Sequence, residues 1–249
     1  LYQFYHNFDN SVKFIQTDYS MTQIFLSYNA NPQVNKILKE QDYRKYLNNI
    51  IVSKYQGEFT TFSSFDNTKG LPLKYEGILA NKNYFTATKL NFISPEEDVE
   101  LVNLSKAITT ILQSEKIDVN LQIIPYYQYL DRMFYTGEFD LALTKYSFDN
   151  KITALNNLFN DDILSFSNFI DNNSNYKELV LKLFNENSFT KQNSIIEEFK
   201  KTMYDEALFT PFFSKKMEYI TNDIYNLKNY NERYNLNTIE HIVKKRGEK

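Results

Sequence analysis

Residues 88–93 read TKLNFI, residues 117–123 read IDVNLQI and residues 139–144 read FDLALT. Each run is short, rich in aliphatic or aromatic residues and bounded by polar positions, which is typical of a β-strand. In the two segments between them, 96–112 and 126–135, apolar residues recur at helical spacing. The order strand, helix, strand, helix, strand predicts an α/β layer with parallel strands and right-handed crossovers.

The first of these helices carries a start signal. Ser94 precedes Pro95, and the acids Glu96 and Glu97 follow. Serine is a favoured N-cap, proline suits the first helical position, and acidic side chains suit the positive end of the helix dipole. We therefore predict that the helix begins at Pro95, with Ser94 as its cap.

Apolar patterning predicts further elements on both sides of this layer. Strands are expected at 23–28, 207–213 and 217–220, and helices at 34–54, 152–160, 177–184 and 191–204. Residues 58–83 follow neither period and predict a long loop.

Composition excludes several classes of function. The 249 residues carry a formal net charge of -3, which argues against a nucleic-acid partner, because phosphate binding needs a basic face. The chain has no cysteine, so thiolate metal sites and cysteine nucleophiles are excluded. Its two histidines, His6 and His241, lie in no metal-ligand spacing. No stretch approaches the ~20 apolar residues that a membrane-spanning helix needs.

Residues 128–149 read QYLDRMFYTGEFDLALTKYSFD and resemble one family. The extracytoplasmic solute-binding proteins of peptide and nickel ABC importers, family 5, carry a helix that ends in a G-x-F-D turn. A strand follows, and then a corner with a small residue, Trp and, three positions after the Trp, Asp. Residues 25–29 (FLSYN), 43–50 (YRKYLNNI) and 208–213 (LFTPFF) are similar, in the same order, to a strand, a helix and a late strand of that family.

The resemblance implies a periplasmic-binding-protein-like fold of type II, with a mixed, largely parallel sheet flanked by helices. Residues 22–214 would form the second, ligand-binding lobe. Residues 1–21 would be an edge segment of the first lobe, and residues 215–249 the return to it. The bulk of the first lobe would lie upstream of this chain.

The corner after the strand supplies the expected ligand contacts. By the resemblance, Asp149 would pair with the α-ammonium of a peptide, and Tyr146, Ser147 and Phe148 would run beside an extended ligand. Tyr146 stands where the family has Trp, and Lys145 where it has Gly; Lys145 would meet a ligand carboxylate. From the residues alone, the more common roles are a turn or cap residue for Asp149, core residues for Tyr146 and Phe148, and a solvated side chain for Lys145.

The expected function is therefore peptide binding between two lobes by hinge closure, as the substrate-binding component of an ABC importer. Its partners would be a peptide or small solute and the permease/ATPase complex. We expect no nucleic acid, no metal or cofactor and no catalysis, a monomer, and an extracytoplasmic location, either periplasmic or as a membrane-anchored lipoprotein. Two alternatives remain open. One is a nickel chelate or another small solute as ligand, and the other is a surface protein that uses the fold for protein contact or signalling.

Overall fold

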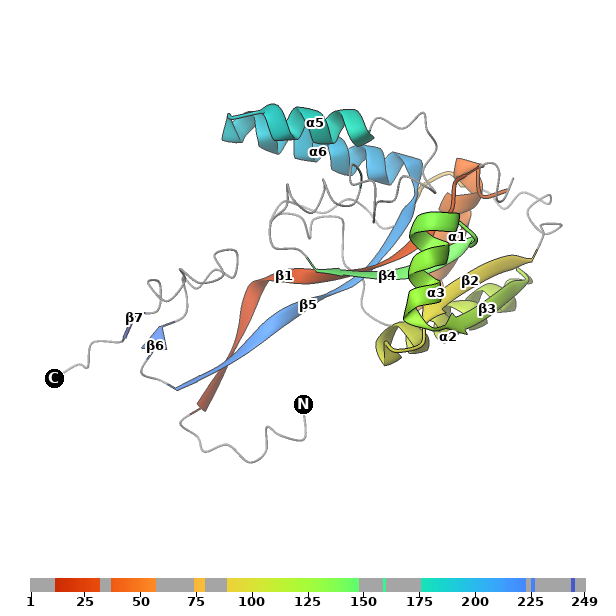
Figure 1. The fold of residues 1–249 in the computed structure, drawn as a ribbon, viewed down its shortest axis with the longest axis horizontal. Helices are drawn as coiled ribbons and strands as arrows, with labels where there is room; N and C mark the ends of the chain where they lie inside the picture. Colours follow the sequence, from red (N-terminus) through yellow and green to blue (C-terminus); the bar gives the residue numbers. More distant parts are fainter. Residues whose placement is uncertain are drawn as a thin grey trace.

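The computed structural model describes residues 12–31, 37–56, 74–78, 89–147, 159, 176–222, 225–226 and 243–244. For residues 12–23, 146–147, 213–222, 225–226 and 243–244 it describes the backbone alone. Within these ranges the chain forms one five-stranded sheet and a separate two-stranded one, with helices on both faces of the larger sheet (Figure 1).

The large sheet has the strand order β3-β2-β4-β1-β5. Its strands are β1 (Val12–Tyr28), β2 (Leu90–Pro95), β3 (Val119–Ile124), β4 (Leu141–Ser147) and β5 (Phe209–Asn222). β2 pairs in parallel with both β3 and β4, while β1 runs antiparallel to β4 and β5. The predicted α/β fold with a mixed sheet is confirmed, and the three strands of the central sequence layer are the parallel ones.

Two apolar cores lie on opposite faces of this sheet. On one face, α1 (Gln41–Lys54) and α2 (Val99–Ser114) pack against side chains such as Phe92 and Leu141. The other face is covered by α3 (Tyr126–Leu130), the π-helix η4 (Asp131–Thr136), α5 (Tyr176–Asn185) and α6 (Phe189–Glu206). Alternate residues of one strand serve the two cores, since Ala142 belongs to the second and its neighbours Leu141 and Leu143 to the first.

β1 and β5 form a ribbon that extends beyond the rest of the sheet (Figure 1). Their ladder runs from Ser27↔Phe209 to Val12↔Asn222, whereas the pairing of β1 with β4 stops at Thr22. Register shifts interrupt the ladder between Gln16 and Phe25. The short strands β6 (Tyr225–Asn226) and β7 (Val243–Lys244) pair with each other. The prediction of two separate strands at 207–213 and 217–220 is wrong, because β5 is continuous.

The predicted start of the second helix is also wrong. Ser94 and Pro95 are the last residues of β2, paired with Ile123 and Ile124 of β3. α2 begins at Val99, and its N-cap is Asp98, whose Oδ1 accepts the backbone N–H groups of Glu100 at 3.0 Å and Leu101 at 3.2 Å. Ladder pairing with β3 holds the Ser-Pro pair in extended geometry, which overrides its local helix-start preference.

Other element boundaries differ in smaller ways. The predicted helix at 126–135 is α3 followed directly by η4, and it ends at Gly137 in a left-handed turn with φ 69°. α1 starts at Gln41, later than the predicted 34. Of the predicted helix at 152–160 only Phe159 is described, and of the predicted loop at 58–83 only 74–78; the rest of both lies outside the described residues.

Arg44 of α1 joins the two helical layers at the end of α6. Its side chain is buried, and its guanidinium donates to the carbonyl oxygens of Leu38 (Nη1, 2.6 Å) and Lys39 (Nη1, 2.9 Å). Nε and Nη2 donate to the carbonyl oxygen of Glu206 at 3.1 and 2.6 Å. Glu206 is the last residue of α6, so Arg44 supplies donors to carbonyl groups at a helix end.

Candidate functional site

The carboxyl ends of β2 and β4 meet at one edge of the sheet. Because the two strands are parallel and Phe92 lies opposite Leu141, the residues just after Pro95 and those near Ser147 lie at this edge. Open α/β sheets bind ligands outside the carboxyl ends of their strands. This edge is therefore the candidate site.

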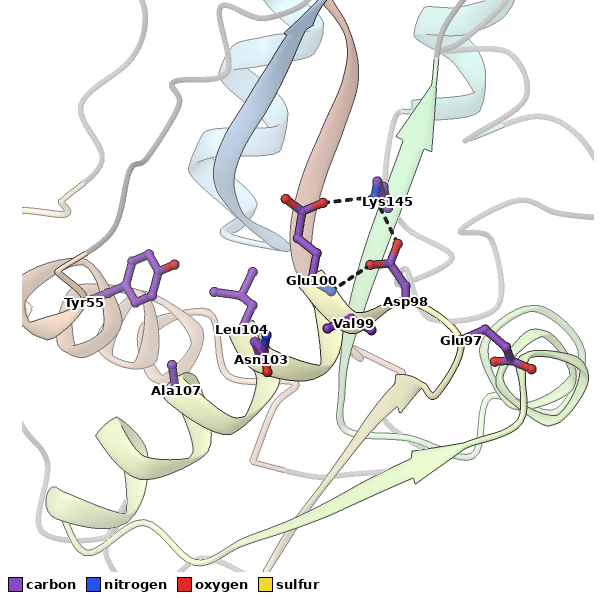
Figure 2. A pocket seen from close by; sticks show the side chains of 9 residues that line it. All are labelled: Tyr55, Glu97, Asp98, Val99, Glu100, Asn103, Leu104, Ala107 and Lys145. Atoms are coloured by element: carbon purple, nitrogen blue, oxygen red, sulfur yellow. Dashed lines mark hydrogen bonds and ion pairs between the residues drawn. The ribbon is translucent and has the colours of Figure 1, made fainter. Parts of the chain in front are cut away.

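Lys145, near the end of β4, is held by two carboxylates from α2 and its cap (Figure 2). Its Nζ lies 3.0 Å from Asp98 Oδ2 and 3.0 Å from Glu100 Oε2. The Lys145 side chain is 28% exposed, so these ion pairs are partly shielded from water. Asp98 thus uses one oxygen to cap α2 and the other to hold β4.

The electrostatics of this cluster follow from these contacts. Partial burial acts to raise the pKa of Asp98, but the hydrogen bonds from Lys145 and from the N–H groups of Leu101 and Glu100 outweigh it and lower that pKa. Burial acts to lower the pKa of Lys145, and its two carboxylate partners outweigh that effect and raise it. Asp98 and Lys145 therefore both stay charged at neutral pH.

A hollow of about 770 Å³ opens beside the cluster, between the end of α1 and the first half of α2. Tyr55, Val99, Leu104 and Ala107 supply apolar surface. The lining also includes Asn103, Glu97, Asp98, Glu100 and Lys145 (Figure 2). The hollow combines apolar walls with three carboxylates and one ammonium group, a lining that can contact both an organic group and a hydrogen-bond donor.

The predicted ligand residues fall partly within the described chain. Lys145 faces Asp98 and Glu100. Tyr146 and Ser147 are the last residues of β4, and their backbones pair with Gln23 and Thr22 of β1. Phe148 and Asp149 lie outside the described residues. The ligand roles of all five remain predictions.

The sequence reasoning missed Asp98 and Glu100. Asp98 carried a recognisable signal, since aspartate just before an apolar helical stripe is a common N-cap. The competing Ser94–Pro95 signal drew the predicted helix start four residues too early. No local signal links either acid to Lys145, which follows them by 47 and 45 residues.

Metal-binding clusters and membrane-spanning helices are both absent from the described part of the chain. It holds no group of three or more His, Asp or Glu side chains placed to bind a metal ion. None of its helices is both long enough and apolar enough to cross a membrane.

Solved structures with the same architecture are numerous. The oligopeptide-binding protein AppA from Bacillus subtilis, in complex with a nonapeptide, matches with a TM-score of 0.65 over 98% of this chain. The chain has the fold of a part of a solute-binding protein. The ABC transporter-associated periplasmic binding protein DppA from Helicobacter pylori, in complex with the peptide STSA, gives a TM-score of 0.66 over 96% of the chain. NikA from Staphylococcus aureus, in complex with Ni(L-His)2, gives 0.66 over 90%.

This likeness is one of fold, because sequence identity to AppA, DppA and NikA is 13%, 14% and 15%. The chain spans about half the length of these solute-binding proteins: 54%, 50% and 51%. No family model and no curated protein matches the sequence. The resemblance seen in residues 128–149 pointed to peptide- and nickel-binding proteins, and structures of both kinds match.

Proposed function

We propose that the full-length protein is the substrate-binding component of an ABC importer and that it holds a peptide between two lobes. The observation that carries this proposal is the solute-binding-protein fold, matched over 98% of the chain by a structure solved with a bound nonapeptide. The charged cluster and the hollow at the carboxyl ends of β2 and β4 support the proposal, because open α/β sheets bind ligands outside the carboxyl ends of their strands.

The proposed mechanism is hinge closure. Residues 22–214 form the ligand-binding lobe, and residues 1–21 and 215–249 belong to the first lobe. The β1–β5 ribbon extends past the rest of the sheet. Its two strands are the two connections between the lobes. A peptide favours the closed state because only that state lets both lobes contact it. No bond is made or broken, so no residue is assigned a catalytic role.

The corner after β4 provides the proposed peptide contacts. Asp149 pairs with the α-ammonium, since a cation enclosed by lobe closure needs a partner of opposite charge. Tyr146, Ser147 and Phe148 run beside the extended peptide and offer backbone hydrogen bonds, as an added strand would. The proposal further includes a permease/ATPase partner, an extracytoplasmic location, a monomeric state and no metal or cofactor.

A nickel chelate is the second candidate ligand. It is favoured by the match to NikA, whose structure holds Ni(L-His)2 and whose TM-score equals that of DppA. The cargo therefore has to be decided by binding rather than by fold.

Thermal unfolding separates the two ligands. A pool of random hexapeptides with free termini, present at 100 times its dissociation constant, is expected to stabilise the full-length protein by about 2.7 kcal/mol, because ligand binds only the folded state. Ni(II)–histidine is the matched comparison and is expected to leave the midpoint unchanged. A shift with Ni(II)–histidine alone would favour the second candidate, and no shift with either would contradict both proposed ligands.

A further inference from the structure

Lys145 is the cation closest in sequence to the proposed peptide contacts, and its ammonium group is already paired with carboxylates of the protein. It immediately precedes Tyr146, yet its Nζ is bonded to Asp98 and Glu100 at 3.0 Å each. Two carboxylates against one ammonium leave the cluster with an excess negative charge. A ligand carboxylate that approached Lys145 would have to displace one of these partners or meet their repulsion.

Asp98 and Glu100 also connect two separate elements of the edge. Asp98 is fixed by the two backbone N–H groups that it caps, and Glu100 lies in the first turn of α2. Both reach the same Nζ on β4 (Figure 2). The start of α2 is thereby held to β4 two residues before the strand ends at Ser147.

The other charged group facing this hollow has the same sign. Glu97 belongs to its lining, and one carboxylate oxygen of Glu97 accepts the backbone N–H of Tyr126 at 3.0 Å. Glu97 therefore adds to the negative field at the edge. Among the described residues that line the hollow, Lys145 is the one basic residue.

We propose that Asp98 and Glu100 are positioning residues. They occupy the Lys145 ammonium, so that a ligand carboxylate cannot pair with it, and they fix the end of β4. As a result, this corner selects against anionic ligand groups. The inference rests on the proposed function and deepens it. The peptide would be bound with its amino end at this corner and its carboxylate elsewhere. It also replaces the expected contact between Lys145 and a ligand carboxylate with an internal one.

The test compares the full-length protein with its Asp98→Asn/Glu100→Gln variant. Asparagine caps a helix as well as aspartate does, so the variant keeps the start of α2. It removes the two negative charges that face the Lys145 ammonium. The probes are two random hexapeptide pools. One has a free amino terminus and an amidated carboxyl end, and the other has an acetylated amino terminus and a free carboxylate.

The wild type is expected to prefer the amine pool, and the variant to shift the ratio of the two affinities at least about tenfold toward the carboxylate pool. The matched control is Glu115→Gln/Asp118→Asn, which removes two carboxylates that pair with Lys54 and Lys89 away from the hollow. The control is expected to leave the ratio unchanged. An unchanged ratio in the Asp98→Asn/Glu100→Gln variant would overturn the proposal.

Hydrogen exchange tests the positioning without any ligand. The backbone of residues 143–147 pairs with β1 from Leu26 to Thr22. Amide protection in residues 143–147 is expected to fall several-fold in the Asp98→Asn/Glu100→Gln variant and to stay unchanged in the control. Unchanged protection in both would overturn the positioning role. If neither pool binds the wild type but protection falls, the proposed peptide function fails while the positioning role stands.

Discussion

Replacing Arg44 with methionine is expected to lower the free energy of unfolding by about 3 kcal/mol, because three carbonyl groups lose a hydrogen bond and each such loss costs about 1 kcal/mol. The carbonyl groups belong to Leu38, Lys39 and Glu206. Methionine keeps an apolar stem of similar length, so the change reports mainly on the lost donors.

Urea unfolding of the wild type and the variant measures this difference. Arg132→Met is the matched control, since Arg132 is only partly buried and donates one side-chain hydrogen bond among the described residues, from Nη1 to Gln122 Oε1 at 2.5 Å. We expect the control to cost under about 1 kcal/mol. A loss at Arg44 no larger than that at Arg132 would contradict its role in joining α1 to the end of α6.

Replacing Asp149 with alanine is expected to weaken peptide affinity at least about 30-fold, because removing one partner of an enclosed charge pair costs about 2 kcal/mol or more. The expectation rests on the proposed role of Asp149 as partner of the ligand ammonium. Isothermal titration of the full-length protein with the free-amine hexapeptide pool measures it.

Two comparisons make the result at Asp149 specific. Asp149→Asn keeps a turn-forming side chain but loses the charge, so it is expected to weaken affinity nearly as much as alanine. An acetylated peptide pool lacks the ammonium and should bind wild type and Asp149→Ala equally. If Asp149→Ala bound the free-amine pool as tightly as the wild type, the amine-anchor role would be wrong.

The parallel layer could be predicted because its strands are short apolar runs separated by helical stripes. β2 is buried on both faces of the sheet: Leu90 and Phe92 belong to one core and Ile93 to the other. In the sequence these residues form a compact, mostly apolar run. The extent of the β1–β5 ribbon could not be predicted in the same way. Residues 16–18 read QTD, and this part of β1 pairs, among the described residues, with β5 alone, so it needs no apolar run to mark it.

Only the β4 part of the candidate site could be predicted from the sequence. The run from Gly137 to Asp149 located the end of β4 and, with it, Lys145. The partners of Lys145 come from a different βα connection and are brought to it by the parallel pairing of β2 and β4. That pairing joins segments that are distant in the sequence, so local sequence patterns do not show it. From the local sequence, Lys145 is therefore assigned to a ligand or to solvent, and nothing connects Asp98 and Glu100 to it.

Native mass spectrometry of the full-length protein, purified from its own compartment without refolding, tests the central claim most directly. A peptide-binding component of an importer is expected to carry co-purified peptides of mixed sequence and similar length, because backbone hydrogen bonds and an amine anchor do not select side chains. A single discrete mass or a metal would point to the second candidate ligand. An empty protein that also fails to bind added peptides would contradict the account.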